Sequence, residues 1–276
     1  MSTPINHSVM KAFQILRSFH SPDEWLTSSE LSRRAHFPDA SGYRLIQTLE
    51  RIGAVARGPN GRYRLGMLLV SLSNNVAIHE CLREAGHKIS RELAARFNLT
   101  VHIGRLEFGM VTYVDKVSSP NSFPVHTRIG AQHEAYCTGL GKVLLAALPE
   151  DQLEIFVMDG DLIALTPYTV KDSKSLRTQL GRARNDGFAI DNRESQANMF
   201  CIAVPICDFE GATIAAMSAT DSAERMTKQR QAEIRVALAT AAAAVSANLF
   251  PFGLSLNKED DSYQNMALAE GDIAEA

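Results

Sequence analysis

The chain has 276 residues, of which 45% are hydrophobic and 21% charged, and its formal net charge is −3. These values are ordinary for a soluble globular protein, and the length allows two domains. No uninterrupted apolar run reaches the roughly 18 residues of a membrane span, and the start MSTPINHSVMKAF lacks the layout of a secretory signal. The four cysteines form no CxxC pair, which favours reduced thiols over a disulfide scaffold. We therefore expect a soluble cytoplasmic protein with no membrane partner.

Charge is distributed unevenly along the chain. Residues 1–66 carry nine Lys and Arg against five Asp and Glu, whereas residues 251–276 carry one Lys against six acids. The basic segment suggests a surface for a polyanion such as nucleic acid, although an excess of this size also occurs by ordinary scatter. The acidic segment, residues 251–276, is short of large apolar side chains and is predicted to be disordered.

The amino-terminal residues show the order helix, helix, turn, helix and β-hairpin. Apolar residues recur at near-helical spacing in VMKAFQILRSF, and Thr27 with Glu30 forms a capping box for a second helix, SSELSRRA. Asp39 is the expected N-cap of a third helix, which Gly53 ends. The turn signal Pro-Asn-Gly then separates the short strands AVARG and GRYRLG. This order predicts a winged helix-turn-helix DNA-binding domain over residues 1–65.

In such a domain the helix after the turn enters the major groove of DNA. The polar face of the third helix offers hydroxyl, amide and guanidinium groups suited to phosphates and base edges, and the hairpin adds arginines suited to phosphates. A solvated helix face, or a protein-interaction module, is the alternative interpretation. The candidate DNA-binding residues are Ser28, Ser41, Gly42, Tyr43, Arg44, Gln47, Thr48, Arg51, Arg57 and Arg62.

Gly42 is unexpected inside the third helix, because glycine in a helix costs about 1 kcal/mol relative to alanine. One explanation is that the missing side chain lets the helix backbone approach DNA closely. The other is that Gly42 fits beneath the neighbouring helix. We favour the first.

The rest of the chain predicts a second domain. Residues 66–80 are expected to form a linker helix whose apolar surface suits either a dimer contact or packing on its own domain. Residues 81–250 then contain helical and strand patterns that predict an α/β (α+β) domain with a central antiparallel sheet. Its expected elements are a helix to Phe97, strands in TVHIGRL, MVTYVDKV and FPVHTRIG, helices in HEAYCTGLGKVLLAAL, EDQLEIFVM and SLRTQLGRARNDG, strands in FAIDN and CIAVPICDFEGATIAAMSAT, and a last helix over about 226–249.

No enzyme motif is complete in this domain. GLGK at 139–142 fails as a phosphate loop, since Tyr136 and Val143 stand where a glycine and a Ser or Thr are required. The histidines show no metal-ligand spacing, and no motif supplies a base to Cys137, Cys201 or Cys207. We expect no catalytic residues, no metal and no cofactor. A small-molecule enzyme with a cysteine nucleophile and an appended helical domain is the alternative.

Strand alternation points instead to a ligand pocket. Asp191 ends one strand, Cys201 begins another, and Ser218 and Thr220 share one face of a third. Polar residues gathered on one sheet face can line a small cavity. Asp191 could equally cap a turn, and Ser218 could be a satisfied core hydroxyl.

Over roughly residues 8–250 the chain resembles the IclR family of bacterial transcriptional regulators. The resemblance rests on LTSSELSRRAHFPDASGYRLIQTLERIGAV and YRLG, and on TGLGKVLLA (138–146), GFAIDNRES (187–195) and CIAVPICDFEGATIAAMSAT (201–220). It implies that the second domain is a GAF-like effector-binding domain. It also implies a set of effector-binding residues, with the backbone amides of Gly139 and Leu140 donating to an effector carboxylate and polar side chains from Asp191, Cys201, Ser218 and Thr220.

The resemblance implies an allosteric function. A homodimer or tetramer would bind a palindromic operator in double-stranded DNA under the control of a small aliphatic or aromatic acid, and would govern a catabolic operon as a repressor or an activator. Two departures leave the effector open: Glu134, Ala135 and Tyr136 stand where relatives often have Pro-Leu-His, and Thr220 stands where a second serine is familiar.

Overall fold

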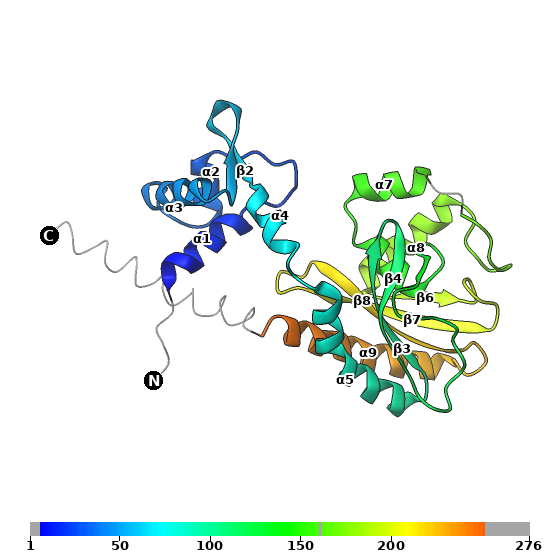
Figure 1. The fold of residues 1–276 in the computed structure, drawn as a ribbon. Coiled ribbons are helices and arrows are strands. Elements are labelled where there is room, and N and C mark those ends of the chain that lie inside the picture. The colour runs from blue at the N-terminus through cyan, green and yellow to red at the C-terminus, as the bar shows by residue number, and fades with distance from the viewer. Residues whose placement is uncertain (1–5, 160–161, 252–276) are drawn as a thin grey trace, which may run out of the picture. The chain divides into compact units, whose positions relative to one another are not determined.

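The computed structural model describes residues 6–159 and 162–251 (Figure 1). The chain divides into two compact units that meet between Ala77 and Ile78. Except for Pro251, the acidic segment that was predicted to be disordered lies outside the described residues.

The first unit is a winged helix-turn-helix, which confirms the predicted fold class. Strands β1 and β2 pair antiparallel across a 3₁₀ turn at Pro59–Gly61, in which Asn60 takes a φ of 60°. The core lies between the helices and this hairpin and includes Ile15, Leu31, Ile46 and Tyr63. Its elements are α1 (His7–Arg17), α2 (Ser28–Arg34), α3 (Asp39–Arg51), β1 (Val55–Arg57), β2 (Tyr63–Leu65) and α4 (Met67–Ser73).

The starts of α2 and α3 show one correct and one wrong prediction. Thr27 and Glu30 form the predicted capping box, with Thr27 Oγ1 accepting from the Glu30 amide at 3.2 Å and Glu30 Oε2 accepting from the Thr27 amide at 2.7 Å. Asp39 is not the N-cap of α3. Pro38 takes that position, and its carbonyl accepts the Gly42 amide at 3.0 Å. Asp39 is therefore the first helical residue, where its negative charge suits the positive end of the helix dipole.

The linker differs from the single helix expected over residues 66–80. Helix α4 spans Met67–Ser73, and the next helix begins only at Ile78. Asn74 and Asn75 stand between them, and asparagine has a low helix propensity because its amide competes with the backbone for hydrogen bonds. The Asn75 side chain does so here, since Nδ2 donates to the Ser71 carbonyl at 3.4 Å.

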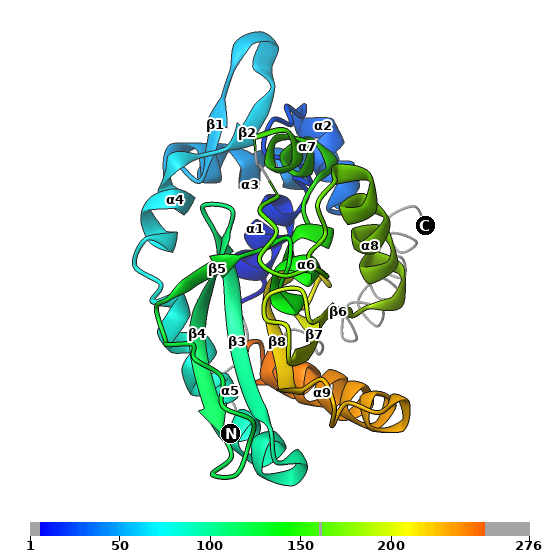
Figure 2. The same ribbon diagram turned by 90° about the vertical axis from the view of Figure 1, so that its right-hand side faces the viewer.

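The second unit contains the predicted antiparallel sheet. Among the described residues it has six strands in the order β5-β4-β3-β8-β7-β6, and every neighbouring pair is antiparallel. Helices α5 and α9 cover one face, whereas α6 covers the other with α8 packed outside it (Figure 2). Its elements are α5 (Ile78–Phe97), β3 (Thr100–Glu107), β4 (Met110–Ser118), β5 (Gln132–Glu134), α6 (Gly139–Ala146), α7 (Glu150–Asp159), α8 (Ser173–Asp186), β6 (Ala189–Asn192), β7 (Met199–Cys207), β8 (Thr213–Ser222) and α9 (Lys228–Leu249).

The strands separate an apolar face from a mixed one. Val101 and Ile103 in β3, like Met217 and Ala219 in β8, pack in the core beneath α5 and α9. Because side chains alternate along a strand, the residues between them point to the α6 face. On that face His102 lies opposite Ser218, within the register of β3 and β8. The alternation therefore places polar residues under α6.

Two predicted elements around α6 are corrected. The segment FPVHTRIG is not a strand but part of the loop between β4 and β5, where Lys116 Nζ donates to the carbonyls of Val125 (2.7 Å) and Thr127 (2.9 Å). The helix expected from His133 begins at Gly139, since residues 132–134 pair with β4 as β5. Thr138 caps the helix, its Oγ1 accepting the Gly141 amide at 3.2 Å.

Within the described part of the chain, α9 is the one helix that is long and apolar enough to cross a membrane, judged by length and composition alone. Ile234, Leu238, Ala242 and Val245 of this helix are buried and belong to the core beneath the sheet. Packing within the second unit accounts for these four apolar residues.

One buried carboxylate joins three elements of the second unit. Asp221, fully buried at the end of β8, accepts from Arg225 at 3.3 Å and from Arg230 at 2.9 Å, and Arg230 also donates to the Phe97 carbonyl at 2.6 Å.

We predict that Asp221→Ala lowers the free energy of unfolding by about 3–5 kcal/mol, because it leaves a partly buried guanidinium without its counter-ion. Urea denaturation would measure this. The exposed Glu224→Ala should change stability by less than about 0.5 kcal/mol, and equal effects would contradict the prediction.

Candidate nucleic-acid interface and ligand pocket

The outer face of α3 carries a run of polar side chains. Tyr43 is 49% exposed, and Arg44, Thr48 and Arg51 are exposed as well. Thr48 Oγ1 donates to the Arg44 carbonyl one turn earlier, at 2.9 Å. The guanidinium groups of Arg44 and Arg51 are the cations on this face. The face therefore has the chemistry of phosphate and base-edge contacts.

Gln47 is used inside the unit. Its Nε2 donates to Tyr63 Oη at 2.9 Å and to Glu50 Oε2 at 3.2 Å, so it ties α3 to β2. The sequence pattern placed Gln47 among the groups that read DNA. In the structure both amide protons have acceptors inside the unit and the amide oxygen is left over, so a DNA contact by Gln47 stays a prediction.

The hairpin arginines are shared between structure and surface. Arg62 donates to the Trp25 carbonyl at 2.9 Å, and the Arg64 guanidinium lies 5.0 Å from the centre of the Trp25 ring. Arg57 lies 5.9 Å from the ring of Tyr63. All three arginines are exposed. Trp25 covers Gly58 and so anchors the hairpin, a role that sequence reasoning missed. The one available signal was that Trp25 is the single tryptophan of the chain.

Gly42 is buried against α2. A Cβ at this position would lie 2.0 Å from Ser32 Oγ and 2.8 Å from Ser32 Cβ, far inside van der Waals contact. The favoured explanation, close approach to DNA, is therefore replaced by the second one. The glycine lets α3 cross α2, and Gly42 is not part of the exposed face.

The six predicted effector-binding residues line one pocket in the second unit. The strand register aligns Asp191 with Cys201 and Cys201 with Thr220, one residue on each of three neighbouring strands. Ser218 lies on the same face, and the first turn of α6 closes the pocket above them. The full lining is His102, Tyr113, Val125, His126, Thr127, His133, Thr138, Gly139, Leu140, Asp191, Ser195, Gln196, Met199, Cys201, Ser218 and Thr220.

Gly139 brings the start of α6 down onto the sheet. A Cβ at this position would lie 3.2 Å from Cys201 Sγ and 3.4 Å from Ala203 Cβ, so a larger side chain would push the helix away. The amides of Gly139 and Leu140 belong to the first helical turn, whose N–H groups have no acceptor within the helix. They lie at the positive end of the helix dipole, which favours a negative group.

Asp191 combines the two roles that the sequence left open. Its side chain caps a turn, since Oδ1 accepts the amides of Glu194 (2.7 Å) and Ser195 (3.3 Å) and Oδ2 accepts the Ser195 hydroxyl. It also lines the pocket, where it is 1% exposed. Burial raises the pKa of Asp191 to about 6, although the hydrogen bonds from Ser195 and Glu194 act in the opposite direction.

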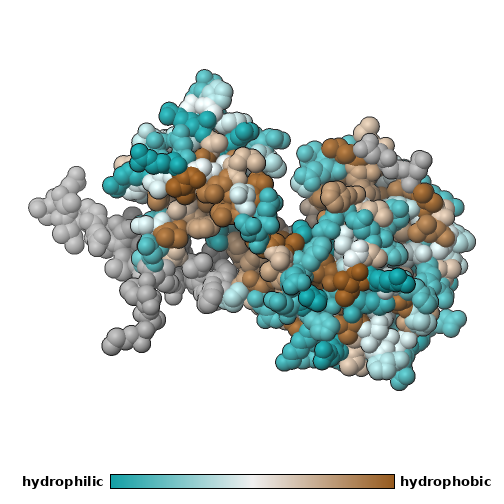
Figure 3. Space-filling model, in the orientation of Figure 1, coloured by the Kyte–Doolittle hydropathy of each residue, from teal (hydrophilic) through white to brown (hydrophobic). Residues whose placement is uncertain are grey.

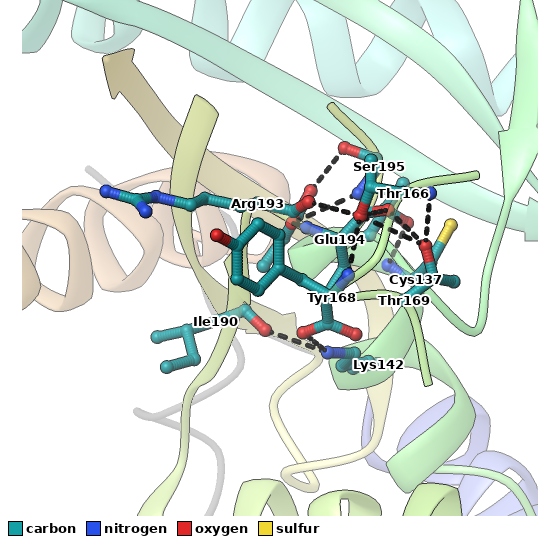
Figure 4. A network of polar contacts seen from close by, with 12 residues as sticks. Cys137, Lys142, Thr166, Tyr168, Thr169, Ile190, Arg193, Glu194 and Ser195 are labelled. Carbon is teal, nitrogen blue, oxygen red and sulfur yellow. Dashed lines mark hydrogen bonds and ion pairs between the residues drawn. The ribbon is translucent and has the colours of Figure 1, made fainter. Parts of the chain in front are cut away.

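A buried ion pair fixes the turn that carries Asp191. Figure 4 shows Lys142 of α6 reaching Glu194. Both side chains are almost fully buried, and Lys142 Nζ also donates to the Ile190 carbonyl at 3.1 Å. The Glu194 carbonyl accepts the Thr169 hydroxyl at 2.7 Å, so the same turn is tied to the segment before α8. Sequence reasoning assigned no role to Glu194. Its partner, Lys142, is 52 residues away in sequence, so no local pattern connects the two residues.

Three ring side chains form the end of the pocket nearest β4, and sequence reasoning missed all of them. The Tyr113 ring centre lies 4.8 Å from that of His102 and 5.3 Å from that of His133, and His102 Nε2 lies 2.7 Å from Thr127 Oγ1. Burial lowers the pKa of His102 to about 3 and raises the pKa of Tyr113. Alternation in TVHIGRL was a usable signal for His102, since its neighbours are aliphatic.

The thiols lack the properties of nucleophiles. Cys137 and Cys201 are buried, and burial raises the pKa of each to about 12. Neither would be a thiolate at neutral pH, and the thiolate is the reactive form. In the part of the chain that the structure describes, no group of three His, Cys, Asp or Glu side chains is placed to hold a metal ion.

A winged helix-turn-helix unit followed by an α/β unit with a polar pocket defines a DNA-binding regulator with a ligand-binding domain. The family models agree with this class: the IclR helix-turn-helix domain matches residues 8–59, and the bacterial transcriptional regulator IclR C-terminal domain matches residues 75–247. The chain belongs to the IclR family of bacterial transcriptional regulators. It is thus a transcription regulator and not an enzyme.

Individual relatives span nearly the whole chain. It is 30% identical to the transcriptional regulator XynR of Escherichia coli over 244 residues, which cover 88% of this chain and 97% of XynR. It is also 30% identical to KdgR of Escherichia coli over 250 residues, covering 89% and 95%.

Two solved structures are similar over the same length. The IclR protein of Thermotoga maritima has a TM-score of 0.59 at 27% identity. An IclR homologue of Microbacterium hydrocarbonoxydans, solved with 4-hydroxybenzoate, has a TM-score of 0.57 at 26% identity. Each comparison covers 88% of this chain and 98% of the other.

The contact between α2 and α3 can be tested by substitution. We predict that Gly42→Ala lowers the free energy of unfolding of the first unit by about 1–3 kcal/mol, because its Cβ has no room beside Ser32. Ser32→Gly should restore part of the loss, so the double variant should be more stable than the sum of the single effects predicts. Gly181→Ala is the matched control, since nothing lies within 4 Å of that position. Strict additivity in urea denaturation would contradict the packing explanation.

Proposed function

We propose that this regulator binds a palindromic operator as a homodimer or tetramer, and that a small organic acid bound beneath α6 changes its affinity for the operator. The observation that carries the proposal is the convergence of all six predicted effector-binding residues on one pocket. They come from α6 and from the three strands β6, β7 and β8, and α7 and α8 separate α6 from those strands in sequence. Chance is a poor explanation for all six residues selected by the family resemblance lining the same pocket.

The chemistry of the pocket supports an acid as effector. The first-turn amides of α6 supply N–H donors for a carboxylate, and hydroxyl groups from Ser218 and Thr220 lie on the sheet below. The space open to the centre of a water molecule is about 80 Å³, several times what a single ordered water needs. The homologue solved with 4-hydroxybenzoate supports an aromatic acid, while an aliphatic acid fits the same donors.

The DNA-binding role rests on the outer face of α3 and on the hairpin. A helix-turn-helix protein commonly reads two half-sites as a dimer, so a palindromic operator goes with two-fold symmetry. Exposed apolar side chains support association of the chains, among them Val9 (53%) and Phe13 (57%) of α1 and Leu72 (56%) of α4. Figure 3 shows apolar patches among the hydrophilic residues on one face of the first unit.

The effector acts in this proposal by binding two conformations with different affinity, only one of which fits the operator. The helices between residues 66 and 97 connect the two units in sequence and would carry the change. Control of a catabolic operon, and a location in the cytoplasm where the operator lies, complete the proposal. Repression and activation are equally compatible with it.

The recognition face is tested through Arg44. Arg44→Ala should weaken binding to the DNA upstream of the gene by about 5- to 150-fold, because it removes a cation directed at phosphate or guanine. A gel shift or fluorescence anisotropy titration at fixed salt would measure the loss. Arg182→Ala, an exposed arginine on α8, is the matched control and should leave the affinity unchanged. Unchanged binding by the Arg44 variant would remove α3 from the interface.

The pocket is tested with acids, including 4-hydroxybenzoate, in a thermal-shift screen followed by operator titration with the best binder. Ser218→Ala combined with Thr220→Val should weaken binding of that acid by about 5- to 150-fold, because each hydroxyl contributes roughly 0.5–1.5 kcal/mol. The same change to an exposed hydroxyl, Thr178→Val on α8, serves as control. Full retention of acid binding by the double variant would show that the acid binds elsewhere.

A further inference from the structure

We propose that the effector pocket selects monocarboxylic acids, and that each acid enters together with one proton that it shares with Asp191. This inference rests on the proposed function, since it assumes that the effector is an acid held beneath α6. It adds two properties that nothing in the family match supplies: the charge of the effector and the proton balance of its binding.

The pocket lining holds a carboxylate but no Lys or Arg. Its one buried acid is Asp191, and its other buried polar groups are neutral hydroxyls, thiols and rings. Burial keeps His102 neutral and lowers the pKa of His133 as well, so neither ring supplies a buried positive charge at neutral pH. His126 lies exposed on the loop at the edge of the pocket.

Cations on the neighbouring elements already have partners, and the guanidinium of Arg193, on the same turn as Asp191, lies 5.7 Å from the centre of the Tyr168 ring. Lys142 is paired with Glu194 and bonded to the Ile190 carbonyl, while Lys116 donates to two carbonyls of the loop that follows β4. The charged and titratable groups around Asp191 are Glu194 from its own turn, Lys142 from α6, Cys137 before α6, Cys201 from β7 and Tyr113 from β4. The Lys142–Glu194 pair has no net charge, and within the described part of the chain the pocket lining offers no Lys or Arg to the carboxylate.

The donors for an acid and Asp191 line the same pocket. The Asp191 amide nitrogen is 3.6 Å from where a Cβ on Gly139 would lie, and both residues line the same space. The Asp191 backbone is thus close to the first turn of α6, and the Asp191 side chain lines the same small pocket, so an effector carboxylate that accepts from the Gly139 and Leu140 amides shares that pocket with the Asp191 carboxylate. Two carboxylates in a dry site do not both stay ionised; they share one proton, as an O–H···O⁻ hydrogen bond.

The proton comes from solvent and no bond other than this hydrogen bond is formed. Asp191 and the free monocarboxylate are both largely ionised above pH 7, since the pKa of Asp191 is about 6 and that of a simple carboxylic acid is lower. Bound together they carry one negative charge, which the helix amides and dipole stabilise. A dicarboxylate would bring a second charge that no cation of the lining offsets, and a buried unpaired charge is costly.

Calorimetry on the full-length protein tests the proton balance directly. Matched pairs of probes are benzoate and terephthalate, butyrate and succinate, and pyruvate and oxaloacetate, with binding enthalpy compared in phosphate and Tris near pH 7.5. We expect uptake of about one proton with the monocarboxylate that binds, and an affinity that falls up to tenfold per pH unit above about pH 7. The dicarboxylate of each pair should bind at least about tenfold more weakly.

Asp191→Asn keeps Oδ1 as acceptor for the Glu194 and Ser195 amides but cannot take up the proton. Its acid binding should be nearly independent of pH between about 7 and 8.5 and should show no uptake, whereas Asp186→Asn, at the exposed end of α8, should behave as the wild type. If the Asn variant does not fold, the buffer comparison on the wild type decides alone.

The outcomes separate the two proposals. Binding of a monocarboxylate without proton uptake, or a dicarboxylate bound as tightly as its partner, would overturn this inference and leave the proposed function standing. Failure of every acid to bind between about pH 5.5 and 8.5 would overturn both.

Discussion

The pocket depends on the buried ion pair between Lys142 and Glu194. Lys142 sits one turn into α6, so the pair holds the first turn of that helix over the sheet. The backbone amide of Glu194 donates to Asp191, so the residue that pairs with α6 also shapes the turn that carries the Asp191 carboxylate. Removing one partner of such a pair leaves a buried charge unpaired, a change that usually costs several kcal/mol. The geometry of the pocket therefore depends on the pairing of these two buried charges.

The ion pair also explains the GLGK stretch, which resembles a phosphate loop and is not one. A Cβ on Gly141 would lie 2.1 Å from the carbonyl oxygen of Ala135, and one on Gly139 would meet Cys201. Both glycines thus allow close packing, the first on the preceding chain and the second on the sheet. The lysine that follows faces a glutamate rather than a phosphate. Residue types alone did not distinguish the two arrangements, because the glutamate is 52 residues away in sequence.

Local patterns predicted most of the fold, and long-range contacts account for what they missed. The capping box of Thr27 and Glu30 and the end of α8 at Gly187, whose φ is 72°, were predictable because the partners lie within a few residues. The hydrogen bond from Gln47 to Tyr63 was missed because Tyr63 lies 16 residues away on the hairpin. Gly42 was misjudged for the same reason, since only the packing of α2 against α3 shows its neighbour Ser32.

The pocket residues also divide into those that local patterns predicted and those whose position depends on long-range contacts. Asp191, Cys201, Ser218 and Thr220 were found from strand alternation together with the family resemblance, both of which are readable in one dimension. The ring cluster and the loop around Thr127 were not. Their place depends on the pairing of β3 with β4 and on hydrogen bonds from Lys116 to loop carbonyls. FPVHTRIG has the alternation of a strand, but its carbonyls are bonded by a lysine instead of a neighbouring strand.

Asp191 is a costly way to cap a turn, which is an argument that its charge has a use. Its pKa in the folded protein, about 6, is above the ordinary value of 3.8, so the folded state binds the proton more tightly than the unfolded chain does. Stability therefore falls as pH rises from about 4 to 6, and the loss persists at neutral pH. A shift of this size corresponds to about 3 kcal/mol.

Asparagine at this position would accept the same two amides on Oδ1 without burying a charge. The turn alone thus does not require a carboxylate, and buried groups with perturbed ionisation are concentrated at functional sites. The carboxylate at residue 191 is better explained by what enters the pocket than by the turn that holds it.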